Sequence, residues 1–124
     1  MASDLIVKIK RYQMKRYYLG ELEELILLTI AGISDPAYGV NILQELDRQT
    51  ARTLDFSTVH STLKRLEEKG FLSSEMGGAT AARGGRRKRF FTITAYGVQA
   101  LRENQEIRAR LWSLVPSKIQ LKGI

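Results

Sequence analysis

The sequence predicts a mainly α-helical chain that carries one small antiparallel β-hairpin. Three observations support this fold class. Apolar residues recur at helical spacing in several separate segments of the chain. Between residues 71 and 94 the spacing changes to the period-two alternation that is typical of a half-buried strand. A glycine-bearing stretch, Gly77 to Gly85, divides that region, so two short strands joined by a loop are expected.

The length and composition fit one small folded domain without sulfur chemistry. The chain has 124 residues, of which 44% are hydrophobic and 27% charged, close to the average of soluble globular proteins. It contains no cysteine, which excludes disulfides, thiolate nucleophiles and zinc sites with sulfur ligands and fits a cytoplasmic location. Its longest apolar stretch is far shorter than the ~20 residues of a membrane span, and no signal-peptide pattern is visible at its start.

Three helices are expected in the first half of the chain, at residues 5–18, 20–32 and 38–50. The second begins with glutamates, which suit a helix N-terminus, and ends at a glycine. It is apolar on nearly all sides after its first turn, so it should be the core element. Residues 33–37 are expected to form a turn, because Pro36 disfavours helical geometry in the residue before it. The third helix is amphipathic.

A fourth helix, Ser57 to Lys69, is the most informative segment. Ser57 is its expected N-cap, and Gly70 is expected to end it. Its apolar side is formed by Val59, Leu63 and Leu66. Its opposite side collects Ser57, His60, Ser61, Lys64, Arg65 and Glu68. Standing alone, this pattern fits an ordinary surface helix with a solvated charged face equally well.

The hairpin and a last helix follow. Phe91 and Ile93 alternate with polar positions in the second strand. Thr94 can cap a final helix from Ala95 to about residue 114, which Pro116 should bring to a close. Two short helices followed closely by a hairpin form the winged helix-turn-helix arrangement, in which the second helix of the pair enters the major groove of DNA.

The predicted architecture is therefore a winged helix-turn-helix with an added helix at each end. Residues 1–18 form an N-terminal helix, residues 19–94 a DNA-binding domain, and residues 95–124 a C-terminal dimerisation helix and tail. The expected partner is double-stranded DNA. The recognition helix should contact it through six residues: Ser57, Thr58, His60, Ser61, Lys64 and Arg65. Lysine and arginine side chains supply donors for phosphates or for the O6 and N7 acceptors of guanine.

The distribution of charge agrees with an anionic partner. The chain has a net charge of +7, and residues 57–94 alone carry +5 whereas residues 19–56 carry −5. Five positive residues stand within seven positions of the expected wing: Arg83, Arg86, Arg87, Lys88 and Arg89. Their neighbouring glycines allow the backbone to approach a phosphate ridge or a minor groove. A charge run of this kind is usually a solvated loop, but its place directly after a candidate recognition helix favours nucleic acid.

No residues in the sequence favour catalysis, a metal site or a cofactor. His60 is the only histidine, so a histidine metal cluster is excluded. Ser57 and Ser61 lie near it in sequence, yet neither has the glycine-rich surroundings of a nucleophile elbow. The chain is not expected to be an enzyme, and no cofactor is expected.

The last helix carries two apolar faces, which implies two surfaces to cover. One face contains Trp112, and the other is a separate stripe. We expect the stripe and the apolar face of the first helix to form a homodimer interface. The residues concerned are Leu5, Ile9, Tyr12, Ile107, Leu111 and Leu114. The alternative is that both faces pack within one subunit.

Several motifs occur in the same order and spacing as in the PadR family, which the chain resembles over roughly residues 19–101. The segments that carry the resemblance are Leu22–Leu28, Ala37–Val40, Ser57–Gly70 and Arg83–Gly97. One departure is His60, where the family usually has a tyrosine. The operator sequence of other members therefore cannot be transferred to this chain.

The resemblance implies a homodimeric winged helix regulator, commonly a repressor that leaves its operator when a small-molecule effector binds. Because a two-fold dimer presents two recognition helices, a roughly palindromic operator is expected. It also implies that the last helix is the dimerisation element and that Trp112 is a possible effector contact. The rival interpretation is a winged helix protein-interaction module, in which the basic wing binds an acidic partner instead of DNA.

Overall fold

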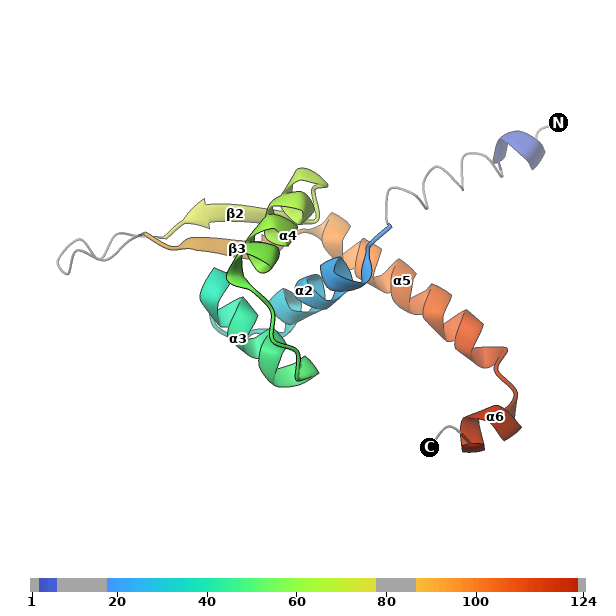
Figure 1. Ribbon diagram of the computed structural model, residues 1–124. Helices are drawn as coiled ribbons and strands as arrows, with labels where there is room; N and C mark the ends of the chain where they lie inside the picture. Colours follow the sequence, from blue (N-terminus) through green and yellow to red (C-terminus); the bar gives the residue numbers. More distant parts are fainter. Residues whose placement is uncertain (1–2, 7–17, 78–86, 123–124) are drawn as a thin grey trace. The chain divides into compact units, whose positions relative to one another are not determined.

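The computed structural model describes residues 3–6, 18–77 and 87–122, and it confirms a mostly helical fold with a small antiparallel sheet (Figure 1). The chain divides into two compact units. One is continuous and comprises Leu19–Val98. The other is built from the two ends of the chain, up to Tyr18 and from Gln99 onward.

Three helices form the helical part of the continuous unit: α2 (Glu21–Gly32), α3 (Gly39–Thr50) and α4 (Phe56–Glu68). Local hydrogen bonds explain where the first two begin. The Gly20 backbone N–H donates to the Glu23 carboxylate at 2.8 Å, and the Tyr38 N–H donates to the Asn41 side-chain oxygen at 2.7 Å. Each bond satisfies a donor next to the first turn of its helix, where no intrahelical partner is available.

A three-stranded antiparallel sheet in the order β1-β3-β2 completes this unit. Its strands are β1 (Ala37–Tyr38), β2 (Leu72–Met76) and β3 (Arg89–Ile93). The hairpin strands β2 and β3 were expected, but the sequence prediction of a simple turn over residues 33–37 was wrong at its end. Ala37 pairs with Phe91, so the last residue of that turn begins a short edge strand.

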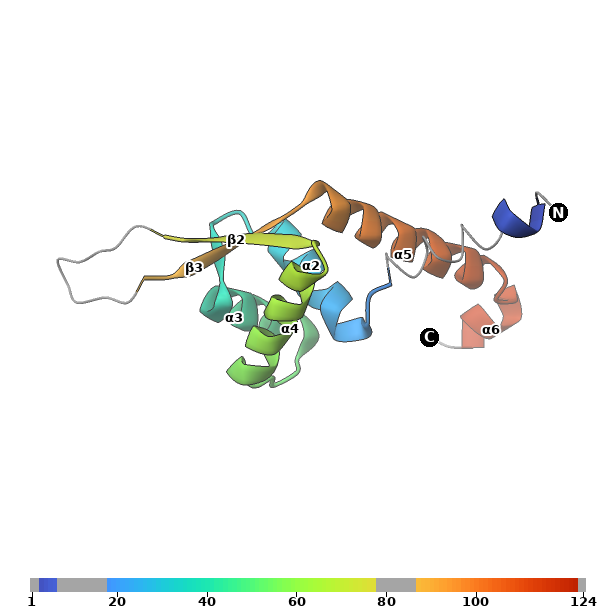
Figure 2. The same ribbon diagram turned by 90° about the horizontal axis from the view of Figure 1, so that it is seen from above.

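The core lies where the three helices meet the sheet, and α2 lies among the other elements as expected (Figure 2). Each of the three helices contributes fully buried apolar side chains, and Phe71, immediately before β2, adds another. These include Ile26, Leu27, Ile42, Leu46, Val59, Leu63, Leu66 and Phe71. Burial of each large apolar side chain stabilises the fold by about 1.5–3 kcal/mol. The apolar side of the fourth helix is therefore confirmed.

The sheet is followed by α5 (Ala95–Ser113), whose start is set by a side-chain cap and a close approach. The Thr94 hydroxyl accepts a hydrogen bond from the Gly97 N–H at 3.0 Å, which confirms the expected cap. Gly97 itself is buried against the Phe71 carbonyl, and a Cβ on Gly97 would collide with it. Glycine is therefore required at this position.

In the second unit, the distal part of α5 is followed by α6 (Ser117–Lys122). The helix α5 ends before Pro116 as expected, but the sequence did not predict that a further helix follows. Of the expected first helix, residues 3–6 are helical, Tyr18 is not, and Ile9 and Tyr12 lie outside the described residues.

Candidate nucleic-acid interface

The solvent-facing side of α4 carries the predicted recognition residues. Ser57, His60, Ser61, Lys64 and Arg65 are all exposed, and Thr58 is half-buried. The opposite side is anchored in the core, because its apolar residues are at most 1% exposed. A helix with one anchored face and one face rich in donors has the form required for entry into a DNA groove.

The start of α4 corrects one sequence prediction. Ser57 is not the N-cap, since the helix begins at Phe56 and Asp55 precedes it in extended conformation. The Thr58 hydroxyl donates to the Asp55 carboxylate at 3.3 Å, which leaves the Ser57 side chain free to face solvent. Serine and aspartate are both good N-cap residues, so residue type alone does not distinguish Ser57 from Asp55 as the cap.

Phe56 is an exposed aromatic residue at the start of α4 that the sequence prediction did not single out. Its side chain is 48% exposed, and its ring stacks on the His60 ring with centroids 6.1 Å apart and an interplanar angle of 20°. The two residues are four positions apart and so share one side of the helix. The signal that could have revealed this pair was the same i, i+4 spacing.

A buried carboxylate fastens the other end of α4 to α2. Glu23 is 8% exposed, and Lys69, immediately after α4, donates to its two carboxylate oxygens at 2.8 and 3.0 Å. The Arg65 Nε lies 3.9 Å from the same carboxylate. Burial by itself raises the pKa of Glu23, but the hydrogen bonds from Lys69 and Gly20 and the nearby positive charges outweigh it and hold the pKa below its ordinary value.

The base of the wing is held in place by contacts that leave its basic residues exposed. Arg89 donates to the Ser74 hydroxyl at 2.9 Å, and Ser74 in turn donates to the Glu67 carboxylate of α4. The Lys88 ammonium lies 4.1 Å from the centroid of the Tyr38 ring, a cation–π contact. Arg87 is also exposed. The predicted wing residues Arg83 and Arg86 lie outside the described residues.

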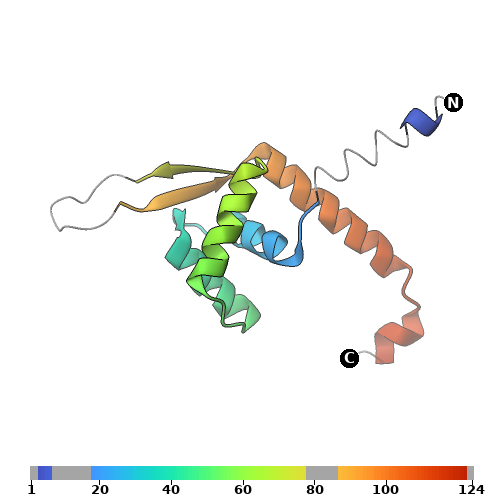
Figure 3. The ribbon, with the colours of Figure 1, turned by 45° about the horizontal axis from the view of Figure 1, so that its top comes forward.

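The first turn of α4 and the basic start of β3 lie on the same side of the continuous unit. In the three ribbon views, the N-terminal end of α4 lies toward the side to which the β2–β3 hairpin extends (Figures 1, 2 and 3). The acidic residues of α4, Glu67 and Glu68, stand at its other end. The described basic residues of the wing thus lie on the side of the N-terminal end of α4, whereas the basic residues of α4 itself, Lys64 and Arg65, stand toward its other end.

The candidate dimerisation residues of the second unit are exposed in the single chain. Leu5, Leu111 and Leu114 are 60–76% exposed, whereas Ile107 is half-buried. Trp112 is 63% exposed and lines a shallow, mostly apolar groove of about 590 Å³ together with Gln105, Arg108, Ala109, Leu111 and Val115. A surface of this kind on one chain is typical of a partner or ligand interface.

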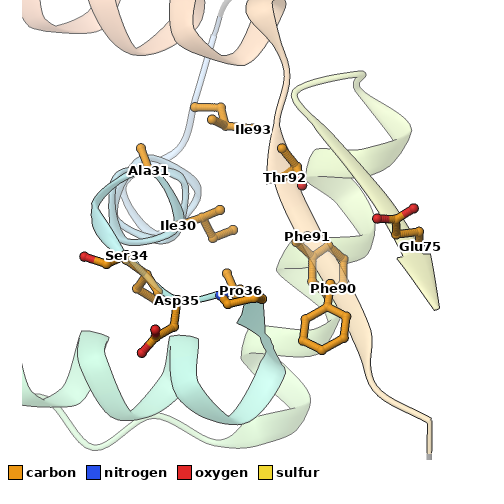
Figure 4. A pocket seen from close by; sticks show the side chains of 12 residues that line it. Ile30, Ala31, Ser34, Asp35, Pro36, Glu75, Phe90, Phe91, Thr92 and Ile93 are labelled. Carbon is orange, nitrogen blue, oxygen red and sulfur yellow. The ribbon is translucent and has the colours of Figure 1, made fainter. Parts of the chain in front are cut away.

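A second hollow of about 530 Å³ lies beside β3, between the sheet and the end of α2 (Figure 4). Ile30, Pro36 and the Phe90–Phe91 pair give it an apolar lining, and Asp35 and Glu75 stand on different elements at its edges. No group of three or more potential metal ligands occurs in the described parts of the chain.

None of the described helices is long and apolar enough to cross a membrane.

Solved structures with the same fold include three PadR-type proteins. A PadR-like transcription factor from Bacteroides fragilis is 25% identical, with 83% of this chain and 91% of that chain covered and a TM-score of 0.66. A PadR family transcriptional regulator from Eggerthella lenta is 24% identical, with 91% of each chain covered and a TM-score of 0.60. A PadR family transcription regulator from Clostridium difficile is 22% identical, with 77% of this chain and 94% of that chain covered and a TM-score of 0.63.

The comparison with curated proteins finds no match. The model of the transcriptional regulator PadR-like family matches residues 26–103, which is more than half of the chain and includes α3, α4, the sheet and the start of α5. The resemblance stated from the sequence motifs is thereby confirmed, as is the expectation that the chain is not an enzyme. The protein belongs to the PadR-like family of transcriptional regulators.

Proposed function

We propose that the protein is a homodimeric repressor that binds double-stranded DNA sequence-specifically and leaves its operator when an effector binds. The observation that carries the proposal is the exposed polar face of α4, a helix whose N-terminal end lies on the side to which the hairpin with its basic residues 87–89 extends. A two-fold dimer presents two such faces about one helical turn apart, or ~34–36 Å, so the operator should be roughly palindromic. Since the partner is chromosomal DNA, we propose a cytoplasmic location.

Two surfaces contact DNA and have different roles in binding. The recognition helix contacts the major groove and its edge through Ser57, Thr58, His60, Ser61, Lys64 and Arg65. The wing supplies affinity through phosphate contacts from Arg83, Arg86, Arg87, Lys88 and Arg89. This division follows from chemistry, because phosphate contacts are the same on every sequence whereas base edges differ.

Arg65 differs from Lys64 in its surroundings. Its guanidinium lies near Glu23 and donates to the Thr62 hydroxyl at 3.4 Å, so part of it is already engaged within the protein. The side chain is nevertheless 55% exposed. We propose that Lys64 reads base edges and that Arg65 contacts the phosphate backbone at the edge of the groove.

The distal part of α5 completes the dimer. We propose that Leu111, Leu114 and the half-buried Ile107 pack against the same residues of a second copy, together with Leu5, Ile9 and Tyr12 of the N-terminal segment. The apolar character of this stripe and its exposure in one chain support the proposal. The groove beside Trp112 then lies next to the interface, where an effector bound through this ring can change the spacing of the two recognition helices.

Equilibrium binding to duplex DNA at several salt concentrations tests the DNA-binding role. A duplex selected by the full chain from a randomised pool should bind with an affinity that falls steeply as salt rises. Arg87→Ala should weaken binding to every duplex and lower the salt slope by about one, whereas Lys64→Ala should change the preference among sequences. Arg48→Ala, which removes an exposed charge on α3 that is paired with Glu45, is the matched control.

The rival interpretation, a protein-interaction module, makes the opposite prediction. If the basic wing serves an acidic protein partner, no duplex should be bound even at about 50 mM salt, where electrostatic attraction to DNA is strong. An equal loss on all sequences from both the Arg87 and the Lys64 variants would contradict the proposed division of labour.

A further inference from the structure

The ring of Phe56 is an apolar group on a surface otherwise proposed to bind through polar and charged side chains. It belongs to the first turn of α4, and 48% of its surface is exposed. The residues that follow it on the same surface, Ser57 and Ser61, have small side chains. Apart from His60, which stacks on the ring, the other exposed residues in the first two turns of α4 are therefore small.

The exposed ring is held in a defined seat. On one side it lies over the start of α3, where a Cβ on Gly39 would come within 2.8 Å of the ring Cε2 atom and 3.0 Å of Cζ. His60 stacks on it nearly in parallel. Because Gly39 has no side chain, the ring lies closer to α3 than it could if residue 39 carried a Cβ atom. An aromatic side chain with two fixed neighbours loses little conformational freedom when it binds a partner.

The chemistry of the major groove leaves few partners for an apolar ring. The base edges there present hydrogen-bond donors and acceptors, with one apolar substituent among them, the C5 methyl group of thymine. A recognition helix contacts bases through its N-terminal residues, and Phe56 is the first residue of α4. An exposed aromatic ring at that position fits a thymine methyl group and gives no hydrogen bond to any other base.

We propose that Phe56, seated on Gly39 and stacked on His60, contacts the methyl group of a thymine in each half-site and so selects thymine at that position. This inference rests on the proposed DNA-binding function and adds to it a residue outside the predicted recognition set. Phe56 is the specificity-determining group, and Gly39 and His60 are positioning residues.

Replacement of thymine by deoxyuridine tests the contact, because it removes the methyl group and leaves every hydrogen-bonding atom in place. A duplex selected by the full chain from a randomised pool is synthesised with each thymine replaced in turn. For the wild-type chain, replacing the contacted thymine in one half-site should weaken binding about fourfold, the value expected for one methyl group taken out of water. Replacement in both half-sites together should weaken binding about fifteenfold.

Two variants connect this loss to the ring. Phe56→Ala should bind the thymine and deoxyuridine duplexes equally well. Gly39→Ala keeps Phe56 but pushes the ring out of its seat, and it should lose most of the discrimination while the helices stay intact by circular dichroism. Leu28→Ala, which removes a large exposed apolar side chain from α2, is the matched control and should discriminate as the wild type does.

The outcomes separate this inference from the proposed function. If the wild type binds the selected duplex but no deoxyuridine replacement weakens binding, the inference is wrong and the DNA-binding role stands. If a replacement weakens binding of the wild type and of Phe56→Ala to the same degree, another residue reads the methyl group and the inference is again wrong. If no duplex is selected at low salt, the proposed function fails and the inference fails with it.

Discussion

Replacing Glu23 with glutamine should loosen the attachment between α2 and the C-terminal end of α4. The carboxylate accepts two hydrogen bonds from the Lys69 ammonium and one from the Gly20 N–H, and only the last can form equally well to an amide. A hydrogen bond to a charged group contributes about 1.5–3 kcal/mol. Since Lys69 is 38% exposed and can turn to water, a loss of about 1–2 kcal/mol is expected.

Thermal unfolding followed by circular dichroism measures this loss. At pH 7 the melting temperature of Glu23→Gln should lie about 3–10 °C below that of the wild type. The difference should shrink with acidification. Because the pKa of Glu23 is lowered in the folded chain, its contribution is fully present above the ordinary value of 4.5 and is lost as pH falls through the lower folded value.

A matched control separates the buried carboxylate from helix-end effects. Glu21 stands in the same first turn of α2 and pairs with Arg52, but its side chain is 63% exposed. Glu21→Gln should therefore change the free energy of unfolding by less than about 0.5 kcal/mol. Equal stability of Glu23→Gln and the wild type at pH 7, or a difference that persists unchanged into strong acid, would refute the reasoning.

Other substitutions test the packing and the proposed dimer. Gly97→Ala should destabilise the protein by about 1–3 kcal/mol in chemical denaturation, because its Cβ meets the Phe71 carbonyl; Gly32→Ala, with open space around it, should not. An equal effect of the two would contradict the close approach. Leu111→Asp should halve the mass measured by sedimentation equilibrium and shift the emission of Trp112 to longer wavelength, as its surroundings become wetter. An unchanged mass would exclude the proposed interface.

The sequence predicted the elements whose signals are local. The apolar faces of the helices follow from the spacing of residues such as Val59 and Leu63, which occur within one or two turns of each other. The hairpin follows from alternation near Phe91, and the cap of α5 from a single threonine, Thr94. In each case the residues that determine the structure lie close together in sequence.

The features that the sequence did not reveal depend on partners far along the chain. The strand β1 exists because Ala37 finds Phe91, and two residues are too few to produce a periodic pattern. The glutamates at the start of α2 fit a helix N-terminus, so nothing marked Glu23 as the one that reaches Lys69. The i, i+4 spacing relates Phe56 to His60, but nothing in the sequence reveals the contact of its ring with Gly39, which is a tertiary contact.

Residue-resolved NMR titration with the selected duplex shows which surface binds DNA. If α4 and the wing form that surface, the largest amide shifts fall on the first two turns of α4, beginning at Phe56, and on residues 87–89. Shifts confined to other surfaces, such as α6 or the C-terminal end of α3, would contradict it.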